Sequence, residues 1–172
     1  MSRKIVLLWV VVLLLAGCQS QTRIDSDPPI MLTVEPRPAP DTVLPVLGGE
    51  ETTLQAWKGT GIVLNFWATW CGPCREEMPL LVEYANSHPE IAVIGVNSQE
   101  DAETAQAFVE EYGISFPILL DERGVMGNRL QLQALPMTVF IGPDGKLRGR
   151  HVGQLTPALL DAWLPALTSS DE

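Results

Sequence analysis

Two kinds of apolar pattern alternate along most of the chain. Residues 62–67 and 91–96 are nearly continuous apolar runs of strand length, as expected for strands covered on both faces of a sheet. After each run, apolar residues recur at helical spacing, which predicts helices over 71–87 and 102–112, the second ending at Gly113. The alternation of strands and helices indicates an α/β fold.

Shorter elements continue this pattern in the second half of the chain. Residues 116–120 form a weaker extended segment, and a short helix is predicted over 125–132. Strands are predicted over 137–141 and 146–152, and the Gly-Pro-Asp-Gly sequence at 142–145 is a strong turn between them. These two strands should therefore form an antiparallel hairpin.

Two further elements complete the predicted domain. Residues 43–47 and 51–54 suggest a short hairpin at its start. Thr156 and Pro157 suit the N-cap and first turn of a last helix that runs to Ala166. The whole pattern predicts a mixed central sheet flanked by helices, with an N-terminal β-hairpin extension.

The first eighteen residues look like an export signal. Arg3 and Lys4 precede twelve apolar residues, 5–16, which suits a signal peptide but is short of the roughly 20 that cross a bilayer as a helix. Residues 15–18, Leu-Ala-Gly-Cys, resemble a bacterial lipoprotein box, which implies a signal peptide over 1–17 and a lipid on Cys18. The alternative is an uncleaved membrane anchor, and both interpretations place the body outside the cytoplasm.

A proline-rich segment separates this signal from the domain. Residues 18–42 contain five prolines, each of which removes a backbone donor and fixes φ, so the segment is interpreted as a semi-rigid tether. The folded domain is predicted over 43–168, with a C-terminal tail over 169–172. A chain of 172 residues has room for one such domain.

Charge and cysteine content exclude several classes of function. The net charge of −10 disfavours nucleic acid as a partner, because phosphate backbones repel an acidic surface. Three cysteines are too few for a disulfide-stapled scaffold or for a zinc site made of cysteines alone. Cys18 is isolated, whereas Cys71 and Cys74 form a close pair.

The pair at 71–74, Cys-Gly-Pro-Cys, carries the candidate chemistry. A strand is expected to become a helix here, so Cys71 lies at a helix N-terminus, where the helix dipole favours a thiolate and lowers the pKa of that cysteine. Cys71 is the predicted nucleophile that attacks a disulfide, and Cys74 is the thiol that resolves the mixed disulfide. Gly72 allows the tight entry, and Pro73 loses no helical hydrogen bond at this position.

A close cysteine pair can also bind a metal, attach haem or form a structural disulfide. A zinc site would need two more ligands, and only His88 and His151 stand out besides Cys18, so no metal is expected. Haem attachment would need a histidine where Arg75 follows Cys74. A purely structural disulfide stays open, although so short a loop stabilises a chain little.

The residues around the pair resemble the thioredoxin superfamily. Residues 66–74, Phe-Trp-Ala-Thr-Trp-Cys-Gly-Pro-Cys, are similar to its active-site turn, and Pro79 matches the proline of its following helix. Residues 75–79, together with the export signal and the leading hairpin, resemble the membrane-tethered branch typified by TlpA and ResA. A thioredoxin-like fold of redoxin type is thereby implied.

The resemblance also implies a substrate-binding surface. Leu135 and Pro136 match the family's cis-proline loop, which packs beside the disulfide and offers backbone groups to an extended chain. An ordinary trans proline is the alternative. Trp70, Gly72 and Pro73 are expected to shape the rim on which a substrate docks.

The proton-transfer group is less clear in the sequence. Cytoplasmic-type thioredoxins carry a buried aspartate where this chain has Asn65, which cannot titrate. By resemblance to the ResA-like branch, Glu100 lies near the cysteines and is a candidate for proton transfer. The alternative is that Glu100 and Asp101 simply begin the next helix, where acids suit the dipole.

The predicted function is an extracytoplasmic thiol-disulfide oxidoreductase that works as a monomer with its own dithiol and no bound cofactor. The resemblance favours a disulfide reductase acting on exported proteins, with apocytochrome c as one substrate. Electrons would come from a membrane thiol carrier of the CcdA or DsbD type.

Three alternatives to this function stay open. A dithiol oxidase or isomerase would use the same residues. A thiol peroxidase of peroxiredoxin type would need Thr-x-x-Cys, but Thr69 lies two residues before Cys71 instead of three. A tethered module that binds a chain without catalysis is the third.

Overall fold

The structure is a computed structural model that describes residues 32–169. The predicted signal peptide over 1–17, the lipidation residue Cys18 and the first part of the predicted tether lie outside the described residues. So do residues 170–172 of the predicted tail. Among residues 32–169, no helix has the length and apolar character needed to cross a membrane.

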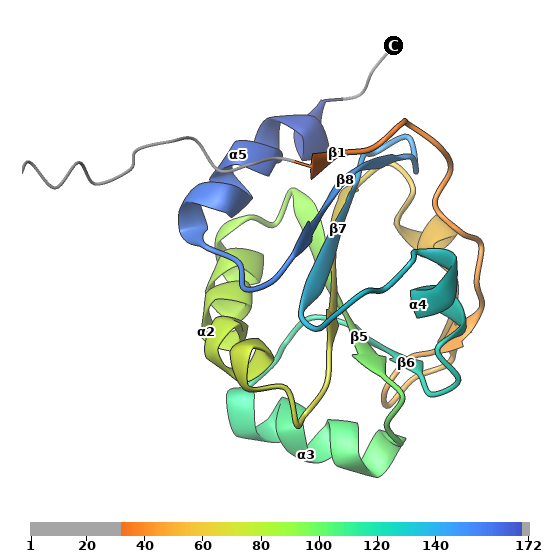
Figure 1. Ribbon diagram of the computed structural model, residues 1–172, viewed down its shortest axis with the longest axis vertical. Coiled ribbons are helices and arrows are strands. Elements are labelled where there is room, and N and C mark those ends of the chain that lie inside the picture. The colour runs from red at the N-terminus through yellow and green to blue at the C-terminus, as the bar shows by residue number, and fades with distance from the viewer. Residues whose placement is uncertain (1–31, 170–172) are drawn as a thin grey trace, which may run out of the picture.

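A mixed six-stranded sheet forms the centre of the molecule (Figure 1). The strands follow the order β1 (Leu32–Thr33), β8 (Leu147–Val152), β7 (Met137–Ile141), β4 (Gly61–Trp67), β5 (Ile91–Ser98) and β6 (Ile118–Asp121). β4 pairs in parallel with β5, and β5 with β6, whereas β7 is antiparallel to both β4 and β8. The mixed sheet predicted from the sequence is confirmed.

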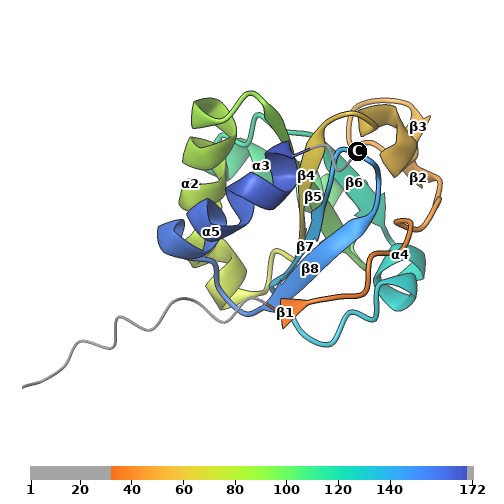
Figure 2. The same cartoon turned by 90° about the horizontal axis from the view of Figure 1, so that it is seen from above.

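Helices cover both faces of the sheet (Figure 2). Three helices lie on one face, and their apolar residues join the core cluster that contains Cys71 and Cys74. They are α2 (Gly72–Ser87), α3 (Ala102–Tyr112) and α5 (Pro157–Thr168). The other face is covered by α4 (Val125–Arg129), the 3-10 helix η1 (Leu54–Trp57) and a small hairpin.

The predicted leading hairpin is present but shorter than expected. β2 (Leu44–Pro45) pairs antiparallel with β3 (Glu51–Thr52) in a separate two-stranded sheet. Val46 then bridges to Leu119 of β6, which fastens the hairpin to the main sheet.

The end of the predicted tether behaves differently from the expectation. Within residues 32–42, β1 pairs with β8, and Ala39 is buried. The backbone N–H of Ala39 donates to the carbonyl of Gly145 at 2.9 Å, and the N–H of Leu147 donates to the carbonyl of Arg37 at 2.9 Å. Without this segment, β8 would be the edge strand of the sheet, and its outer N–H and C=O groups would be unpaired. Residues 32–42 form hydrogen bonds with part of that edge.

Candidate active site

The cysteine pair lies where β4 passes into α2. Cys71 is the N-cap residue of α2, and its Sγ accepts a hydrogen bond from the backbone N–H of Cys74 at 3.3 Å. Cys71 and Cys74 form a disulfide with a Cα–Cα distance of 5.3 Å. The first turn of the helix contains no acidic residue, so the N–H groups and the dipole at this end favour a thiolate on Cys71.

The two cysteines differ slightly in their exposure to solvent. Cys71 is 4% exposed, and Cys74 is completely buried. An incoming disulfide therefore meets Cys71 first. This asymmetry supports the assignment of Cys71 as nucleophile and Cys74 as resolving thiol, which stays a prediction.

The loop before β7 comes to the same end of the sheet. The Leu135–Pro136 peptide bond is cis. β7 begins next to it with Met137, which is paired with Phe66 near the end of β4. Leu135 packs against the core cluster that includes both cysteines. The loop and the disulfide thus lie at the same end of the sheet, where Leu135 is half-buried and Pro136 is buried, and the substrate-binding role of both residues stays a prediction.

Trp70 is the most exposed large apolar residue of this surface. Its exposed fraction is 72%, whereas Trp67, three residues earlier, is buried and stacks on Phe108 with ring centroids 4.5 Å apart. Gly72 and Pro73 are also exposed beside the disulfide. A large apolar side chain left in water next to a reactive group suits a docking contact.

Glu100 holds the loop that leads to Cys71. One carboxylate oxygen accepts a hydrogen bond from the backbone N–H of Thr69 at 2.8 Å and another from Asn97 Nδ2 at 2.7 Å. The other oxygen accepts from the Thr69 hydroxyl at 2.5 Å. These contacts make Glu100 a positioning residue for the active-site turn, and its role in proton transfer stays a prediction. Asp101 caps α3 separately.

Glu77 is a buried acid that the sequence reasoning missed. Its carboxylate is 1% exposed and accepts hydrogen bonds from Asn65 Nδ2 and from the backbone N–H of Leu155, both at 2.8 Å. Asn65 Nδ2 also donates to the Thr138 hydroxyl at 3.1 Å. Burial raises the pKa of Glu77, against the smaller lowering effect of the hydrogen bonds from Leu155 and Asn65.

The position of Glu77 could have drawn attention to it. Residues three apart on a helix share a face, so a residue three after the buried Cys74 must point toward the same core. A glutamate at such a position is unusual, because acids are rarely buried without a function or a partner. Asn65, one of its partners, stands where the resemblance placed the aspartate of cytoplasmic thioredoxins.

Arg75 ties the start of α2 to α3. Its guanidinium carbon lies 5.4 Å from the ring centroid of Phe108 and 5.3 Å from that of Tyr112. It also forms a salt bridge of 2.7 Å with Glu111. The stacked aromatic rings and the cation fix the helix that carries Cys74.

Metal ligands do not gather in the part of the chain that the structure describes. Within residues 32–169 there is no group of three or more histidine, cysteine, aspartate or glutamate residues able to hold a metal ion.

Comparison with known families identifies the family to which the chain belongs. The model of the AhpC/TSA family matches residues 36–150, more than half of the chain. The chain belongs to the AhpC/TSA family. The matched region of this AhpC/TSA-family protein includes both cysteines, Glu77, Glu100 and Pro136.

Curated relatives of the AhpC/TSA-family chain are named for thiol chemistry. It is 38% identical over 126 residues to the thioredoxin-like protein YneN of Bacillus subtilis strain 168, covering 71% of this chain and 74% of that protein. It is 35% identical over 124 residues to the thiol-disulfide oxidoreductase ResA of Halalkalibacterium halodurans, covering 71% and 70%. The chain is a thiol-disulfide oxidoreductase of the ResA type.

Solved structures confirm the thioredoxin-like fold. A thiol:disulfide interchange protein DsbE from Chlorobium tepidum is similar with a TM-score of 0.73 and 27% identity, covering 78% of this chain and 99% of that one. A secreted Mycobacterium tuberculosis disulfide oxidoreductase, homologous to E. coli DsbE, is similar with a TM-score of 0.66 and 27% identity, covering 74% and 96%.

Proposed function

We propose that the chain is an extracytoplasmic disulfide reductase for exported proteins, with Cys71 as nucleophile and Cys74 as resolving thiol. The observation that carries this proposal is the disulfide at the N-terminus of α2, which directly follows the exposed Trp70 and lies at the same end of the sheet as the cis-proline loop. These features together allow an extended chain to present a disulfide to Cys71.

The reaction transfers two electrons from the protein dithiol to the substrate. The Cys71 thiolate attacks one sulfur of the substrate disulfide, a protein–substrate disulfide forms, and the other substrate sulfur leaves as a thiolate. Cys74 then loses its proton and attacks Cys71 Sγ. The second substrate thiol is released, and the Cys71–Cys74 disulfide seen in the structure is left.

Glu77 is the acid best placed to accept the proton of Cys74. Glu77 lies one helical turn after Cys74, and both residues are on the buried face of α2. Burial raises the pKa of Glu77, so its carboxylate is a stronger base than an exposed one. Glu100, whose oxygens already accept three hydrogen bonds, supports the turn instead.

Substrate contacts follow from the exposed groups around the disulfide. Trp70, Gly72 and Pro73 are exposed on one side of the disulfide. At the same end of the sheet, Leu135 is half-buried and Pro136 lies buried beneath the surface. A chain that lies across this surface in extended form would place its cysteine over Cys71 Sγ.

The proposed compartment rests on the sequence at the start of the chain. The basic residues, the apolar run and Cys18 favour export and lipid attachment, either at the outer face of the cytoplasmic membrane or at an outer membrane if the cell has one. The similarity to a secreted disulfide oxidoreductase agrees with export. A membrane thiol carrier of the CcdA or DsbD type would restore the dithiol, and apocytochrome c is one class of substrate.

The direction of electron flow is tested by an equilibrium redox titration of the chain from residue 32 onward, which lacks Cys18. A reductase requires a potential near that of thioredoxin, about −270 mV, whereas a potential near that of DsbA, about −120 mV, would make the protein an oxidant. Mass spectrometry after alkylation measures the Cys71–Cys74 disulfide against a defined thiol buffer.

Cysteine variants separate catalysis from simple binding. Cys74→Ser should accumulate a protein–substrate disulfide through Cys71, and Cys71→Ser should form none, as seen on non-reducing gels. A non-catalytic binding module predicts that the double serine variant keeps the cellular phenotype. Peroxide consumption by the wild-type chain at a rate similar to disulfide reduction would favour the peroxidase alternative.

A further inference from the structure

Asn65 joins three elements of the core through its side-chain amide. It belongs to β4, the strand that leads to Cys71, and its side chain is completely buried. Its Nδ2 donates hydrogen bonds to Glu77 Oε1 at 2.8 Å and to the Thr138 hydroxyl at 3.1 Å. The amide therefore links the buried acid of α2 to β7, the strand that follows the cis-proline loop.

The orientation of this amide is unfavourable for Asn65 itself. Its Oδ1 atom is buried and has no hydrogen-bond partner among the described residues. A buried carbonyl oxygen without a donor costs stability, so most side chains in a core are arranged to avoid it. Here the amide nitrogen is kept toward Glu77 and Thr138 despite that cost, which points to a requirement for N–H groups at this place.

Both hydrogen bonds to Glu77 come from groups that only donate. Asn65 Nδ2 donates to one carboxylate oxygen, and the backbone N–H of Leu155 donates to the other, each at 2.8 Å. Such donors stabilise a carboxylate more than a protonated acid. Burial, the larger effect, raises the pKa of Glu77, and the hydrogen bonds from Leu155 and Asn65 lower it. Asn65 thus favours the charged form of Glu77 against the effect of burial.

The elements around Glu77 carry further titratable groups. They are Cys71 at the N-cap of α2, Cys74, Arg75, Glu76, Glu83 and Tyr84 of α2, Arg148, Arg150 and His151 of β8, and Asp161 of α5. β4 and β7 carry none. Burial raises the pKa of Tyr84 to about 12, so Tyr84 stays neutral. His151 is the Cα partner of Thr138 and needs a control of its own.

We propose that Asn65 is a positioning residue that holds the Glu77 carboxylate in place and in its charged form, ready to accept the proton of Cys74. The inference rests on the proposed function, because it concerns the second step of the same reaction. In that step Glu77 takes the Cys74 proton, and the Cys74 thiolate attacks Cys71 Sγ. The Cys71–Cys74 bond forms, and the bond from Cys71 to the substrate breaks. The substrate sulfur leaves with the electron pair and takes a proton from water, to which Glu77 later returns its own.

The second step can be timed with dithiobis(nitrobenzoate), an aromatic disulfide that releases a coloured thiolate. The full chain with Cys18→Ser, reduced, kept in detergent and present in excess, is mixed with this reagent over a range of pH. Attack by Cys71 releases the first thiolate, and attack by Cys74 on the mixed disulfide releases the second. The pH midpoint of the second phase reports the proton acceptor, and a normal first phase shows that a variant is folded.

Loss of the Asn65 amide should change the second phase. In Asn65→Leu, which has a similar shape but no donor, Glu77 holds its proton to higher pH. The midpoint should rise by about one pH unit, and the rate below it should fall about tenfold. Asn65→Ala removes the same donor with less bulk and should shift the midpoint in the same direction. In the Glu77→Gln background, Asn65→Leu should cause no further shift, whereas a merely structural effect would persist there.

Asn97 supplies a matched control on the neighbouring strand β5. It is also completely buried, its Nδ2 donates to Glu100 Oε2 at 2.7 Å, and its Oδ1 likewise has no partner within residues 32–169. Asn97→Leu therefore makes the same change beside the other acid near the turn. The midpoint of its second phase should equal that of the wild type, and so should the midpoint of His151→Gln.

The outcomes separate the two proposals. If the reduced wild-type chain gives no first phase, Cys71 is not a nucleophile and the proposed function fails. If both phases occur but the Asn65 variants leave the midpoint in place, or shift it equally in the Glu77→Gln background, the function stands and the role of Asn65 is overturned. A shift in Asn97→Leu instead of Asn65→Leu would assign proton transfer to Glu100 and overturn that role as well.

Discussion

Glu77 and Glu100 are two acids near the active-site turn, and their surroundings separate their roles. Glu100 is half-buried, and its oxygens accept hydrogen bonds from Thr69 and Asn97, so it holds the backbone of the turn that leads to Cys71. Glu77 lies on the buried face of α2, the same face as Cys74, and burial raises the pKa of Glu77. An acid whose pKa is raised, one helical turn after a thiol that must lose a proton, suits proton transfer.

Replacement of Glu77 should change how stability depends on pH. Because the pKa of Glu77 is raised above the roughly 4.3 of an exposed glutamate, the folded chain holds the proton more tightly than the unfolded chain. This contribution to stability is fully present below about pH 4.3 and is lost as the pH rises through the raised pKa. Glu77→Gln should therefore lose less stability over that range, as measured by urea unfolding of the oxidised protein from about pH 4 to about pH 8.

Glu76 supplies the matched control for this experiment. It is the neighbouring residue on the same helix, it is exposed, and Glu76→Gln makes the same change in charge. The free energy of unfolding of Glu76→Gln should depend on pH in the same way as that of the wild type. Parallel curves for Glu77→Gln and the wild type would remove Glu77 as a perturbed acid.

At the scale of the elements, the fold depends on close approach between β4 and α5. Gly61 begins β4, and a Cβ at this position would overlap the backbone of Leu167 in α5. The central strand and the last helix can therefore pack at this distance only with glycine at residue 61. This contact supports the strand that leads directly to Cys71.

Gly61→Ala should destabilise the protein by about 1–3 kcal/mol, because the overlapping atoms are backbone and cannot rotate away. Gly72→Ala is the control, since nothing lies within 4 Å of a Cβ at that position and alanine suits a helix. Urea unfolding of both variants gives the difference in free energy. Equal stabilities would show that β4 and α5 shift apart at little cost.

Elements with strong local signals were predictable from the sequence. The helix over 102–112 ends at Gly113 as expected, because Asp101 caps its start and Gly113 adopts a left-handed conformation at its end. β4 was likewise visible as an apolar run, since a central strand is buried on both faces. The residues of these two elements specify their own local structure, so the elements can be predicted without knowledge of distant contacts.

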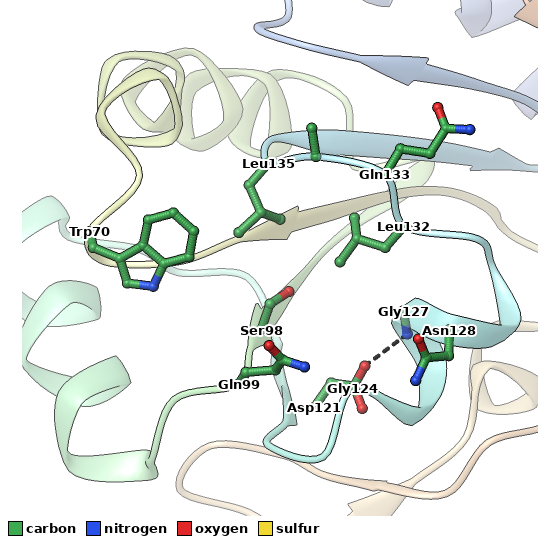
Figure 3. A pocket seen from close by; sticks show the side chains of 11 residues that line it. Trp70, Ser98, Gln99, Asp121, Gly124, Gly127, Asn128, Leu132, Gln133 and Leu135 are labelled. Atoms are coloured by element: carbon green, nitrogen blue, oxygen red, sulfur yellow. Dashed lines mark hydrogen bonds between the residues drawn. The ribbon is translucent and has the colours of Figure 1, made fainter.

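Features that depend on distant contacts were not predictable in the same way. β1 has only two residues, too few to show an apolar pattern in the sequence, so its pairing with β8 could not be predicted. The environment of Glu77 depends on Asn65 and Leu155, which lie far away in the sequence. A surface pocket beside Trp70 likewise joins the ends of β5 and β6 to the loop before β7, so its lining comes together only in the folded chain (Figure 3).

At the scale of the whole molecule, the segment over 32–42 decides where the stable unit begins. It covers the outer edge of β8 with β1 and with the backbone hydrogen bonds of Arg37 and Ala39. A chain that starts at residue 43, the boundary predicted from the sequence, would leave the edge of β8 open to water and to other chains.

We expect the chain from residue 43 to be less stable than the chain from residue 32 by about 2 kcal/mol, because several backbone hydrogen bonds and the buried Ala39 are lost. Urea unfolding measures this difference. Both chains should have the same redox potential, because β8 and β7 separate β1 from the strand that leads to the cysteines. Equal free energies of unfolding would contradict a structural role for the segment, whereas unequal potentials would mean that the sheet edge influences the cysteine pair.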